Sequence, residues 1–287
     1  MPIPDPMPGG SSTIDKAFIE AFKANVVHLC QQHPSRLRST VTEQVVKAEI
    51  ANIERMGFVE AVERTTRHTP TVILDVPHSR RRFPMQDWYW ADLIDREDEV
   101  RMLISPKSEY AKSGAWAMNR RIDRTIIEAA TGESMDGDGV AVPFDPSMIV
   151  GSAGGGLTLD AVLAAKEKLD ANEVDADGRY LVINAKALSD LLSTTEVTSQ
   201  DFNTVRALVD GSLNKWLGFQ IIHTELVAED QAQALAYHKS AIRLGVGLDI
   251  ATKIDVRPDV SYATQVFLSW TGGATRVEEE KIVQILI

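Results

Sequence analysis

The sequence predicts a protein of the α+β class. Three features carry this prediction: one long helix at residues 106–131, alternating helices and strands between residues 157 and 224, and a mainly β segment after residue 240. With 287 residues, the chain is long enough for one large domain or two ordinary ones with a sizeable hydrophobic core.

Composition and charge exclude several classes of protein. Hydrophobic residues make up 44% and charged residues 25%, as in a globular rather than a disordered chain. No run approaches the roughly 18 apolar residues of a membrane span, and residues 1–12 lack the basic and apolar regions of a secretion signal. A single cysteine, Cys30, excludes an internal disulfide framework. The net charge of −11 argues against a protein whose function is to bind the nucleic acid backbone. We therefore expect no sequence-specific DNA binding, and the lack of an apolar span predicts no membrane binding.

The N-terminal region is predicted to be an arm that packs against another subunit. The first dozen residues are rich in Pro, Gly and Ser, and residues 14–32 then form a predicted amphipathic helix. Its narrow apolar stripe consists of Ile14, Phe18, Phe22, Val26 and Leu29. A neighbouring subunit is the simplest partner for this stripe. A second helix is predicted at residues 41–56, ended by Gly57.

A long β-hairpin is predicted next. Residues 69–76 (TPTVILDV) have the β-branched, apolar composition of a strand, and residues 85–94 return with Trp88 and Trp90 at alternate positions. Between them the turn PHSRRRFP places Arg80, Arg81 and Arg82 at the predicted tip. An acidic run follows the hairpin, with Asp95, Glu97, Asp98 and Glu99.

The long helix at residues 106–131 has clear ends. Ser105 is a good N-cap, Pro106 suits the first helical position, and Gly132 follows as a stop. Gly114 costs this helix about 1 kcal/mol relative to alanine, which predicts a close crossing or a bend there.

The rest of the chain is predicted as mixed α/β and then β. Expected helices lie at 157–169 and 185–192, expected strands at 180–184, 219–224, 241–246, 262–270 and 282–287, and an expected turn at Gly272-Gly273.

No catalytic constellation is apparent, and we predict no enzyme, cofactor or metal. The loop GSAGGG (Gly151 to Gly156) precedes a helix but lacks the lysine of a phosphate-binding P-loop. Cys30 lies near His28 and His33, yet on a helix these side chains point in different directions. The Asp/Gly turns at residues 136–138 and 175–177 lack the spaced ligands of a calcium loop.

The arginines at the predicted tip have three readings. As a nucleic-acid patch they would be small and opposed by the protein's negative charge. As a docking element they match the acidic run of a neighbouring copy (Asp95, Glu97, Asp98, Glu99). They can also form a solvated, purely structural loop.

The order of these parts resembles a tailed-bacteriophage major capsid protein of the HK-97-like fold, of the podophage-type coat protein family. The resemblance rests on residues 88–132 (WYWADLIDREDEVRMLISPKSEYAKSGAWAMNRRIDRTIIEAATG) and on residues 236–283 (AYHKSAIRLGVGLDIATKIDVRPDVSYATQVFLSWTGGATRVEEEKIV). The second stretch carries Arg257-Pro258-Asp259 and, further on, ATRVE at residues 274–278.

The resemblance implies a domain plan. It comprises an N-terminal arm (1–40), the start of a peripheral domain (41–64), an extended loop (65–103), the peripheral domain with its spine helix (104–139), an axial domain (140–229) and a return to the peripheral domain with the C-terminal β segment (230–287). Arg80, Arg81, Arg82, Trp88, Trp90, Asp95, Glu97, Asp98, Glu99, Phe18 and Phe22 are then candidate interface residues.

The resemblance also implies a function and partners. Hexamers and pentamers would assemble in the host cytoplasm into the icosahedral shell of a virion around double-stranded DNA, with a portal and room for a decoration protein. The short region before the hairpin favours a separate scaffolding protein, and the absence of lysine from residues 65–103 gives no support for crosslinking through the loop. The alternatives are an encapsulin-type nanocompartment and, more remotely, a phosphate-ligand-binding enzyme that uses Gly151–Gly156.

Overall fold

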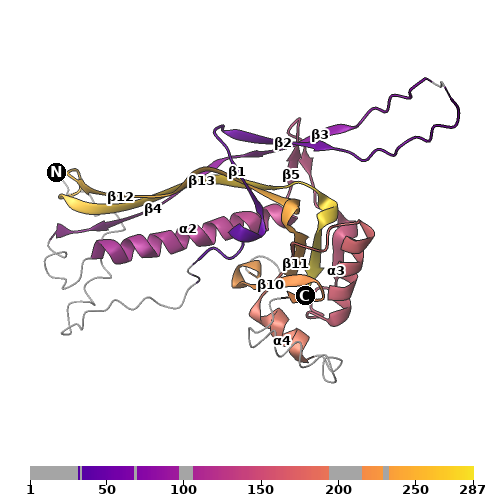
Figure 1. Ribbon diagram of the computed structural model, residues 1–287. Helices are drawn as coiled ribbons and strands as arrows, with labels where there is room; N and C mark the ends of the chain where they lie inside the picture. Colours follow the sequence, from indigo (N-terminus) through magenta and orange to yellow (C-terminus); the bar gives the residue numbers. More distant parts are fainter. Residues whose placement is uncertain (1–31, 33, 68–69, 97–105, 194–214, 229–232) are drawn as a thin grey trace. The chain divides into compact units, whose positions relative to one another are not determined.

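The computed structural model describes residues 32, 34–67, 70–96, 106–193, 215–228 and 233–287 (Figure 1). They divide into two compact units. Unit 1 comprises the described residues up to Ser35 together with Gln86–Asp123 and Val246–Gly272; unit 2 comprises Arg36–Met85, Arg124–Gly245 and Gly273–Ile287. Among the described helices, none is long and apolar enough to cross a membrane.

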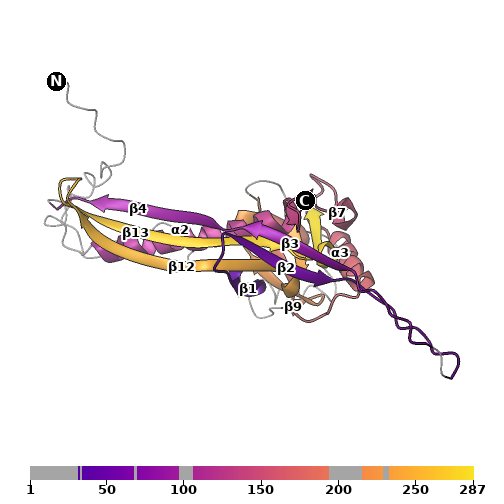
Figure 2. The ribbon, with the colours of Figure 1, turned by 90° about the horizontal axis from the view of Figure 1, so that it is seen from above.

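Unit 1 is built on a long helix and long antiparallel strands. It contains β4 (Gln86–Ile94) and most of the helix α2 (Pro106–Thr131) and of the strands β12 (Ile242–Arg257) and β13 (Ala263–Arg276). The end of α2, the start of β12 and the end of β13 belong to unit 2. The strands follow the sheet order β1-β12-β13-β4, where β1 is Thr42–Val45, and the three long ones run side by side in Figure 2. The predicted helix at Pro106–Thr131 is confirmed to the residue.

Helix and sheet approach closely at Gly114. A Cβ atom on this residue would lie 2.5 Å from Leu268 Cδ1 and 2.6 Å from Trp90 Cε3, well inside van der Waals contact. About two turns further along the helix, the Arg121 guanidinium lies over the Trp88 ring, 3.9 Å from its centroid. The predicted close crossing at Gly114 is therefore confirmed. Trp88 and Trp90 of β4 both pack against α2 of the same chain.

Unit 2 contains a six-stranded mixed sheet in the order β7-β14-β11-β8-β10-β9. Its strands are β7 (Ile149–Gly151), β14 (Ile282–Leu286), β11 (Gln233–His238), β8 (Arg179–Ile183), β10 (Phe219–His223) and β9 (Lys215–Trp216). The unit also holds α3 (Leu159–Ala171) and α4 (Ala185–Ser193), and α3 starts where the Thr158 hydroxyl accepts a hydrogen bond from Ala161 N–H at 3.2 Å. The predicted helices and strands of this region are present, shifted by one or two residues.

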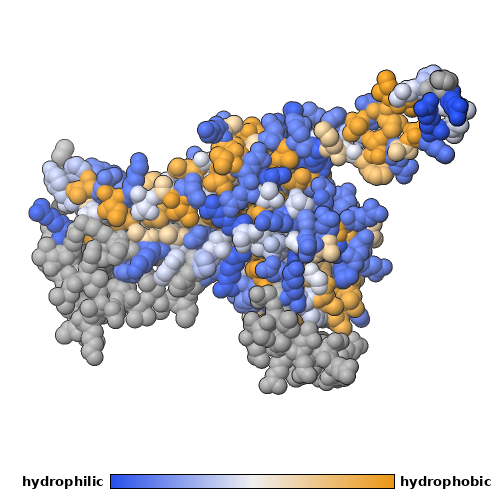
Figure 3. Space-filling model, viewed as in Figure 1, coloured by the Kyte–Doolittle hydropathy of each residue, from blue (hydrophilic) through white to orange (hydrophobic). Residues whose placement is uncertain are grey.

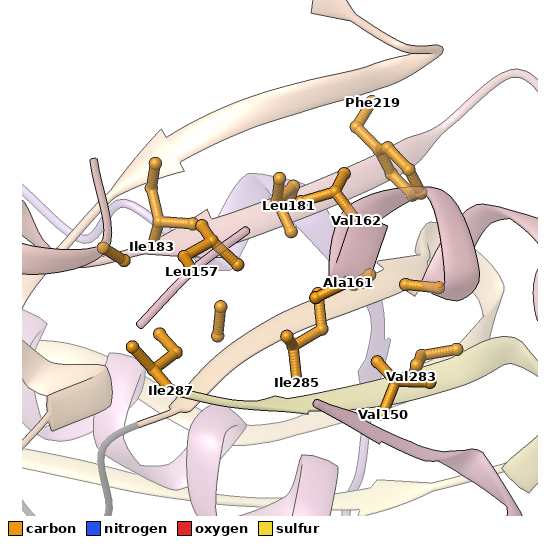
Figure 4. Packing of buried hydrophobic residues seen from close by; sticks show 14 of the residues in the cluster. Val150, Leu157, Ala161, Val162, Leu181, Ile183, Phe219, Val283, Ile285 and Ile287 are labelled. Atoms are coloured by element: carbon orange, nitrogen blue, oxygen red, sulfur yellow. The ribbon is translucent and has the colours of Figure 1, made fainter. Parts of the chain in front are cut away.

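The six-stranded sheet and its helices enclose an apolar cluster drawn from distant parts of the chain (Figure 4). Leu157 and Val162 from the α3 region, Leu181 from β8 and Ile285 from β14 are all fully buried. β11 and β14 thus belong to this sheet, although both come from residues 230–287, the predicted return to the peripheral domain. The domain boundaries themselves stay predictions.

A third sheet carries the hairpin that projects from unit 2. Its order is β2-β3-β5-β6, with β2 (Ile50–Met56), β3 (His78–Pro84), β5 (Ser134–Asp136) and β6 (Ala141–Val142). Short 3-10 helices complete the described structure at Arg38–Thr40, Pro146–Met148, Glu225–Ala228, Lys239–Ala241 and Glu279–Lys281.

The predicted helix at residues 41–56 is wrong, because this segment forms β1 and β2. Along β2, Ala51 and Ile53 are buried while their neighbours are not, which is the period of two of a half-buried strand. Pairing with β3, from Ile50 opposite Pro84 to Met56 opposite His78, overrides the helical spacing of the apolar residues.

The predicted partners within the hairpin are also wrong. The described residues between 70 and 77 belong to no strand, β3 pairs with β2, and β4 pairs with β13 from Gln86 opposite Gly272 to Ile94 opposite Thr264. The three arginines consequently lie within strand β3 and not at a tip, and the loop of the hairpin is residues 57–77.

The predicted turn at Gly272-Gly273 is replaced by continuous strand. Both glycines lie within β13, and a Cβ on Gly273 would come within 2.4 Å of the Pro84 carbonyl oxygen. Glycine is needed here because another backbone approaches the strand closely, and not because the chain reverses.

Substitution of Gly114 tests the crossing in unit 1. Gly114→Ala gains about 1 kcal/mol of helix propensity but overpacks the contact at a cost of about 1–3 kcal/mol, so we expect a net loss in the free energy of unfolding. Chemical denaturation measures it, with Lys112→Ala on the exposed face of the same helix as control. Adding Trp90→Leu should relieve the Gly114→Ala defect; additive effects of the two substitutions would contradict the proposed contact.

Asp92 gives unit 1 a pH dependence. Burial raises the pKa of this β4 carboxyl above its ordinary value of 3.8, against the lowering effect of the hydrogen bond from Leu93 N–H. A raised folded-state pKa contributes stability that is present below the unfolded pKa and is lost as the pH rises through the folded value. Asp92→Asn keeps an oxygen for the Leu93 amide and cannot ionise. Thermal unfolding should show it to be more stable than the wild type at pH 7 and equal at pH 3; equal stability at both values would rule this out.

Candidate assembly interface

The loop of the hairpin, residues 57–77, exposes an unusual amount of apolar surface (Figure 3). Phe58 is 84% exposed and Ile73 is 92% exposed. The exposed apolar residues of this loop are Phe58, Val62, Val72, Ile73, Leu74 and Val76. Large apolar patches on a soluble chain mark interaction sites, so this projecting loop is the first candidate for an interface.

Tight packing holds the base of the projecting loop. Gly57 N–H donates to the Pro77 carbonyl at 2.8 Å, one step beyond the last pair of the β2–β3 ladder. A Cβ on Gly57 would lie 2.6 Å from Pro77 Cγ, so glycine is required where the two arms meet. The loop therefore begins from a fixed point.

Below this loop, a buried charge cluster ties β3 to the C-terminal part of unit 2. We call Arg55, Arg81, Arg276 and Glu279 the charge cluster. The Glu279 carboxylate accepts hydrogen bonds from Arg81 Nη2 and from Arg276 Nε, the latter at 3.3 Å. Arg81 is 4% exposed and Arg276 fully buried, so both ion pairs lie in a region of low dielectric where charge interactions are strong.

Arg276 also completes the end of α2. Its Nη1 donates to the Gly132 carbonyl at 2.6 Å and to the Ala130 carbonyl at 3.4 Å. These carbonyls lie at the negative end of the helix dipole, and the last turn of α2 has no basic residue of its own. A guanidinium from β13 thus supplies the missing positive charge. Burial lowers the pKa of Arg276, and Glu279 opposes this effect.

Arg55 links the other hairpin strand to the same place. Its Nη1 donates to the Val277 carbonyl at 2.7 Å and lies 4.0 Å from Glu279, while its Nε donates to Ser79 Oγ at 3.1 Å. Both hairpin strands are therefore fixed to the segment that follows β13.

The three arginines of β3 differ in environment, as alternation along a strand requires. Arg81 points into the charge cluster, whereas Arg80 is exposed and pairs with Glu54 at 2.6 Å across the strands. Arg82 is half-buried. Arg80 and Arg82 remain candidates for the predicted docking role. Arg81 is already paired with Glu279 of the same subunit.

The other predicted interface residues are placed in part. Trp88 and Trp90 are half-buried against α2, and Asp95 is half-buried just after β4. Glu97, Asp98, Glu99, Phe18 and Phe22 lie outside the described residues. The exposed apolar residues of the loop are not among the predicted interface residues, although the apolar run TPTVILDV contains Val72, Ile73, Leu74 and Val76.

The glycine loop before α3 does not suit a phosphate. Gly154 N–H donates to the Ile287 carbonyl at 3.0 Å and Gly155 N–H to the Ser152 carbonyl at 3.1 Å, so both amides are occupied. At Gly156 an added Cβ would meet the Asp190 carboxylate at 3.0 Å, and this negative group would repel a phosphate.

The acidic turn at residues 136–140 is explained by turn formation. Asp136 Oδ1 accepts from Val140 N–H and Asp138 N–H, both at 2.9 Å, and the hydrogen bond from Val140 is the main reason that the pKa of Asp136 is lowered. Within the part of the chain that the structure describes, no group of three His, Cys, Asp or Glu residues is arranged to hold a metal. His28, Cys30 and His33, for which no metal site was predicted, lie outside it.

Comparison with known proteins decides the family. The model of a family described as phage capsid protein matches residues 14–287. The chain belongs to this family. It is a shell-forming major capsid protein, a structural protein and not an enzyme, and its place is the capsid of the virion.

Solved structures confirm the predicted HK-97-like fold of this capsid protein. The capsid of the cyanophage P-SCSP1u is similar with a TM-score of 0.71 and 16% identity, over 95% of this chain and 94% of that one. A structure from Mycobacterium phage Che8 is similar at 0.70 and 19% identity (93% and 97%), and the capsid of Ralstonia phage GP4 at 0.73 and 9% (93% and 94%). No curated protein matches the sequence. These findings do not favour the encapsulin alternative.

Neutralising Glu279 tests the charge cluster. In Glu279→Gln, Arg81 and Arg276 stay buried without their counter-charge, so we expect the free energy of unfolding to fall by about 3–5 kcal/mol. Glu54→Gln, which removes the exposed partner of Arg80, should cost no more than about 1 kcal/mol. Denaturant titration of both variants measures the difference, and similar losses would show that burial of the cluster is unimportant.

Proposed function

We propose that the chain is the repeating subunit of a closed icosahedral shell that encloses the double-stranded DNA of a tailed phage. Hexamers and pentamers form the shell, which assembles in the host cytoplasm, and each projecting loop lies over an adjacent subunit. Family membership supports the shell, and the exposed apolar loop on a fixed base supports the contact between neighbours.

The single observation that carries the role of the loop is its pattern of burial. Phe58 and Ile73 expose their apolar side chains to water. Burial of each side chain against a partner would contribute about 1.5–3 kcal/mol of favourable free energy. Meanwhile the Glu279 ion pairs hold the base of the hairpin in unit 2. A rigid base with an apolar end is suited to reach a partner rather than to fold back.

The proposed domain plan keeps the order of the predicted parts but changes the bounds of the hairpin and some of the contact residues. Residues 50–84 form the extended hairpin, residues 106–131 the spine helix, and the six-stranded sheet the body of the axial domain, which meets its copies at the symmetry axes. Trp88 and Trp90 are moved from the interface to the interior of the subunit. Arg80, Arg82, Asp95 and residues 97–99 stay proposed contacts, as do Phe18 and Phe22 of the arm.

Charge and partners complete the proposal. A net charge of −11 gives a container whose lining does not hold on to the packaged DNA. A separate scaffolding protein, a portal and a decoration protein are the further partners that a shell of this kind would use.

Electron microscopy of the purified chain, with light scattering on the same sample, tests the proposal. Closed icosahedral particles, or tubes and partial shells without a scaffold, are the expected result. A monodisperse monomer or dimer, even with a scaffolding protein added, would overturn it. Particles that enclose a co-purifying enzyme instead of DNA would favour a nanocompartment.

The double substitution Phe58→Ser/Ile73→Ser separates folding from assembly. Both side chains are almost fully exposed, so thermal unfolding of the subunit should not change. The concentration needed for assembly should rise by about tenfold or more, because apolar contacts between neighbours are lost. Val140→Ser, an exposed apolar residue outside the loop, is the matched control. Normal shells from the double variant would exclude the loop as an interface.

A further inference from the structure

Arg81 of the charge cluster is a buried cation with an unused donor. Its side chain is 4% exposed, and its Nη2 donates to the Glu279 carboxylate. Its buried Nε has no hydrogen-bond partner in the part of the chain that the structure describes. A guanidinium keeps its proton and carries five N–H donors, so leaving such a donor buried without an acceptor is costly.

The other two guanidinium groups of the charge cluster do not share this shortage. Each nitrogen of Arg276 has an acceptor: Nη1 donates to the Gly132 carbonyl at 2.6 Å and Nη2 to the Val142 carbonyl at 3.2 Å. Its Nε donates to Glu279 at 3.3 Å. The Arg55 side chain is 25% exposed, so donors that it does not use within the chain can reach water. The unused donor of Arg81 therefore lies where neither the protein nor bulk solvent satisfies it.

The charge cluster also carries an excess of positive charge. Its three arginines surround one carboxylate, Glu279. Asp136 lies opposite Arg81 in the β3–β5 pairing and brings a second negative charge. The pKa of Asp136 is lowered mainly by the hydrogen bond from Val140 N–H, and the positive charge of Arg81 is a lesser cause. Three positive and two negative charges leave one positive charge uncompensated among these groups, and buried charges in proteins are normally paired.

We propose that the charge cluster binds a small monovalent anion, of the size of chloride, at Arg81 Nε. Such an ion provides at one place the acceptor that Nε lacks and the negative charge that the cluster lacks. A water molecule could accept the hydrogen bond but would leave the charge unbalanced. Because Arg81 belongs to β3, the ion stabilises the base of the hairpin within one subunit. This site does not depend on the proposed function.

Burial and charge restrict the ligand to this class. A side chain that is 4% exposed is out of reach for a carboxylate of another subunit or a phosphate of nucleic acid, because either would have to bring its own chain with it. Free phosphate is larger and carries more negative charge, which Glu279 and Asp136 would repel. Glu279 is 15% and Arg55 25% exposed, so a small ion exchanges with solvent on this side of the cluster.

Thermal unfolding of the full chain in sodium chloride and in sodium gluconate at equal ionic strength tests the site. Equal ionic strength keeps general screening the same, and gluconate is too large to enter. A ligand that binds only the folded state raises its stability as the ligand concentration rises, so we expect the melting temperature to be about 3–6 °C higher in chloride. The same melting temperature in both salts would overturn the proposal.

Arg81→Lys locates the effect. Lysine keeps a positive charge for Glu279 but has no Nε donor, so the difference between the two salts should disappear. Arg80→Lys is the matched control, because Arg80 is the exposed neighbour on the same strand and pairs with Glu54. This variant should keep the wild-type difference. An equal difference in both variants would mean that chloride acts elsewhere on the protein, and the proposed site would then be wrong.

Glu279→Gln provides an answer that does not depend on the folding of Arg81→Lys. Without this carboxylate the positive charge of the cluster is less balanced, so chloride should bind more tightly and the difference between the salts should increase about twofold. An unchanged or smaller difference would contradict the site. In the wild type, saturable broadening of the chloride NMR line measures the same binding directly, and its absence would also count against the proposal.

Discussion

The ion pairs of one carboxylate, Glu279, connect parts of the structure that lie far apart in the sequence. Arg81 brings the hairpin to this group and Arg276 brings the end of the spine helix. Burying two guanidinium groups is expensive unless every charge and most donors find a partner. The carbonyls at the end of α2 provide several of those partners, so helix, hairpin and C-terminal strands stabilise one another.

This arrangement suits a thin projection to the assembly role proposed for it. A two-stranded hairpin alone is marginally stable in water and would sample many directions. Two guanidinium groups, those of Arg55 and Arg81, fix the base of this one, and the pairing of β3 with β5 adds a third strand. Each subunit can then present the same apolar loop in the same direction, and the many weak contacts of a shell require such uniformity.

The sequence predicted what local chemistry determines and failed where distant partners decide. Ser105, Pro106 and Gly132 defined the spine helix to the residue, and Gly114 correctly indicated a close crossing. Residues 41–56 were read as a helix because nothing local shows that β3 would pair with them. Arg81 looks like an exposed loop residue until Glu279, 198 positions away, is placed beside it. Residues 70–76 of the predicted strand 69–76 belong to no strand, because no described part of the same chain pairs with them.

The distance along the chain between Arg81 and Glu279 also has a consequence for biosynthesis. A ribosome releases the hairpin long before it releases Glu279, whose carboxylate anchors the hairpin. Strand β7 likewise leaves the ribosome long before its partner strand β14. A nascent subunit therefore carries its apolar loop on an unanchored hairpin and beside an incomplete sheet. With the proposed contact through the loop, the late position of Glu279 would keep neighbouring nascent chains on one messenger RNA from assembling until translation reaches that residue.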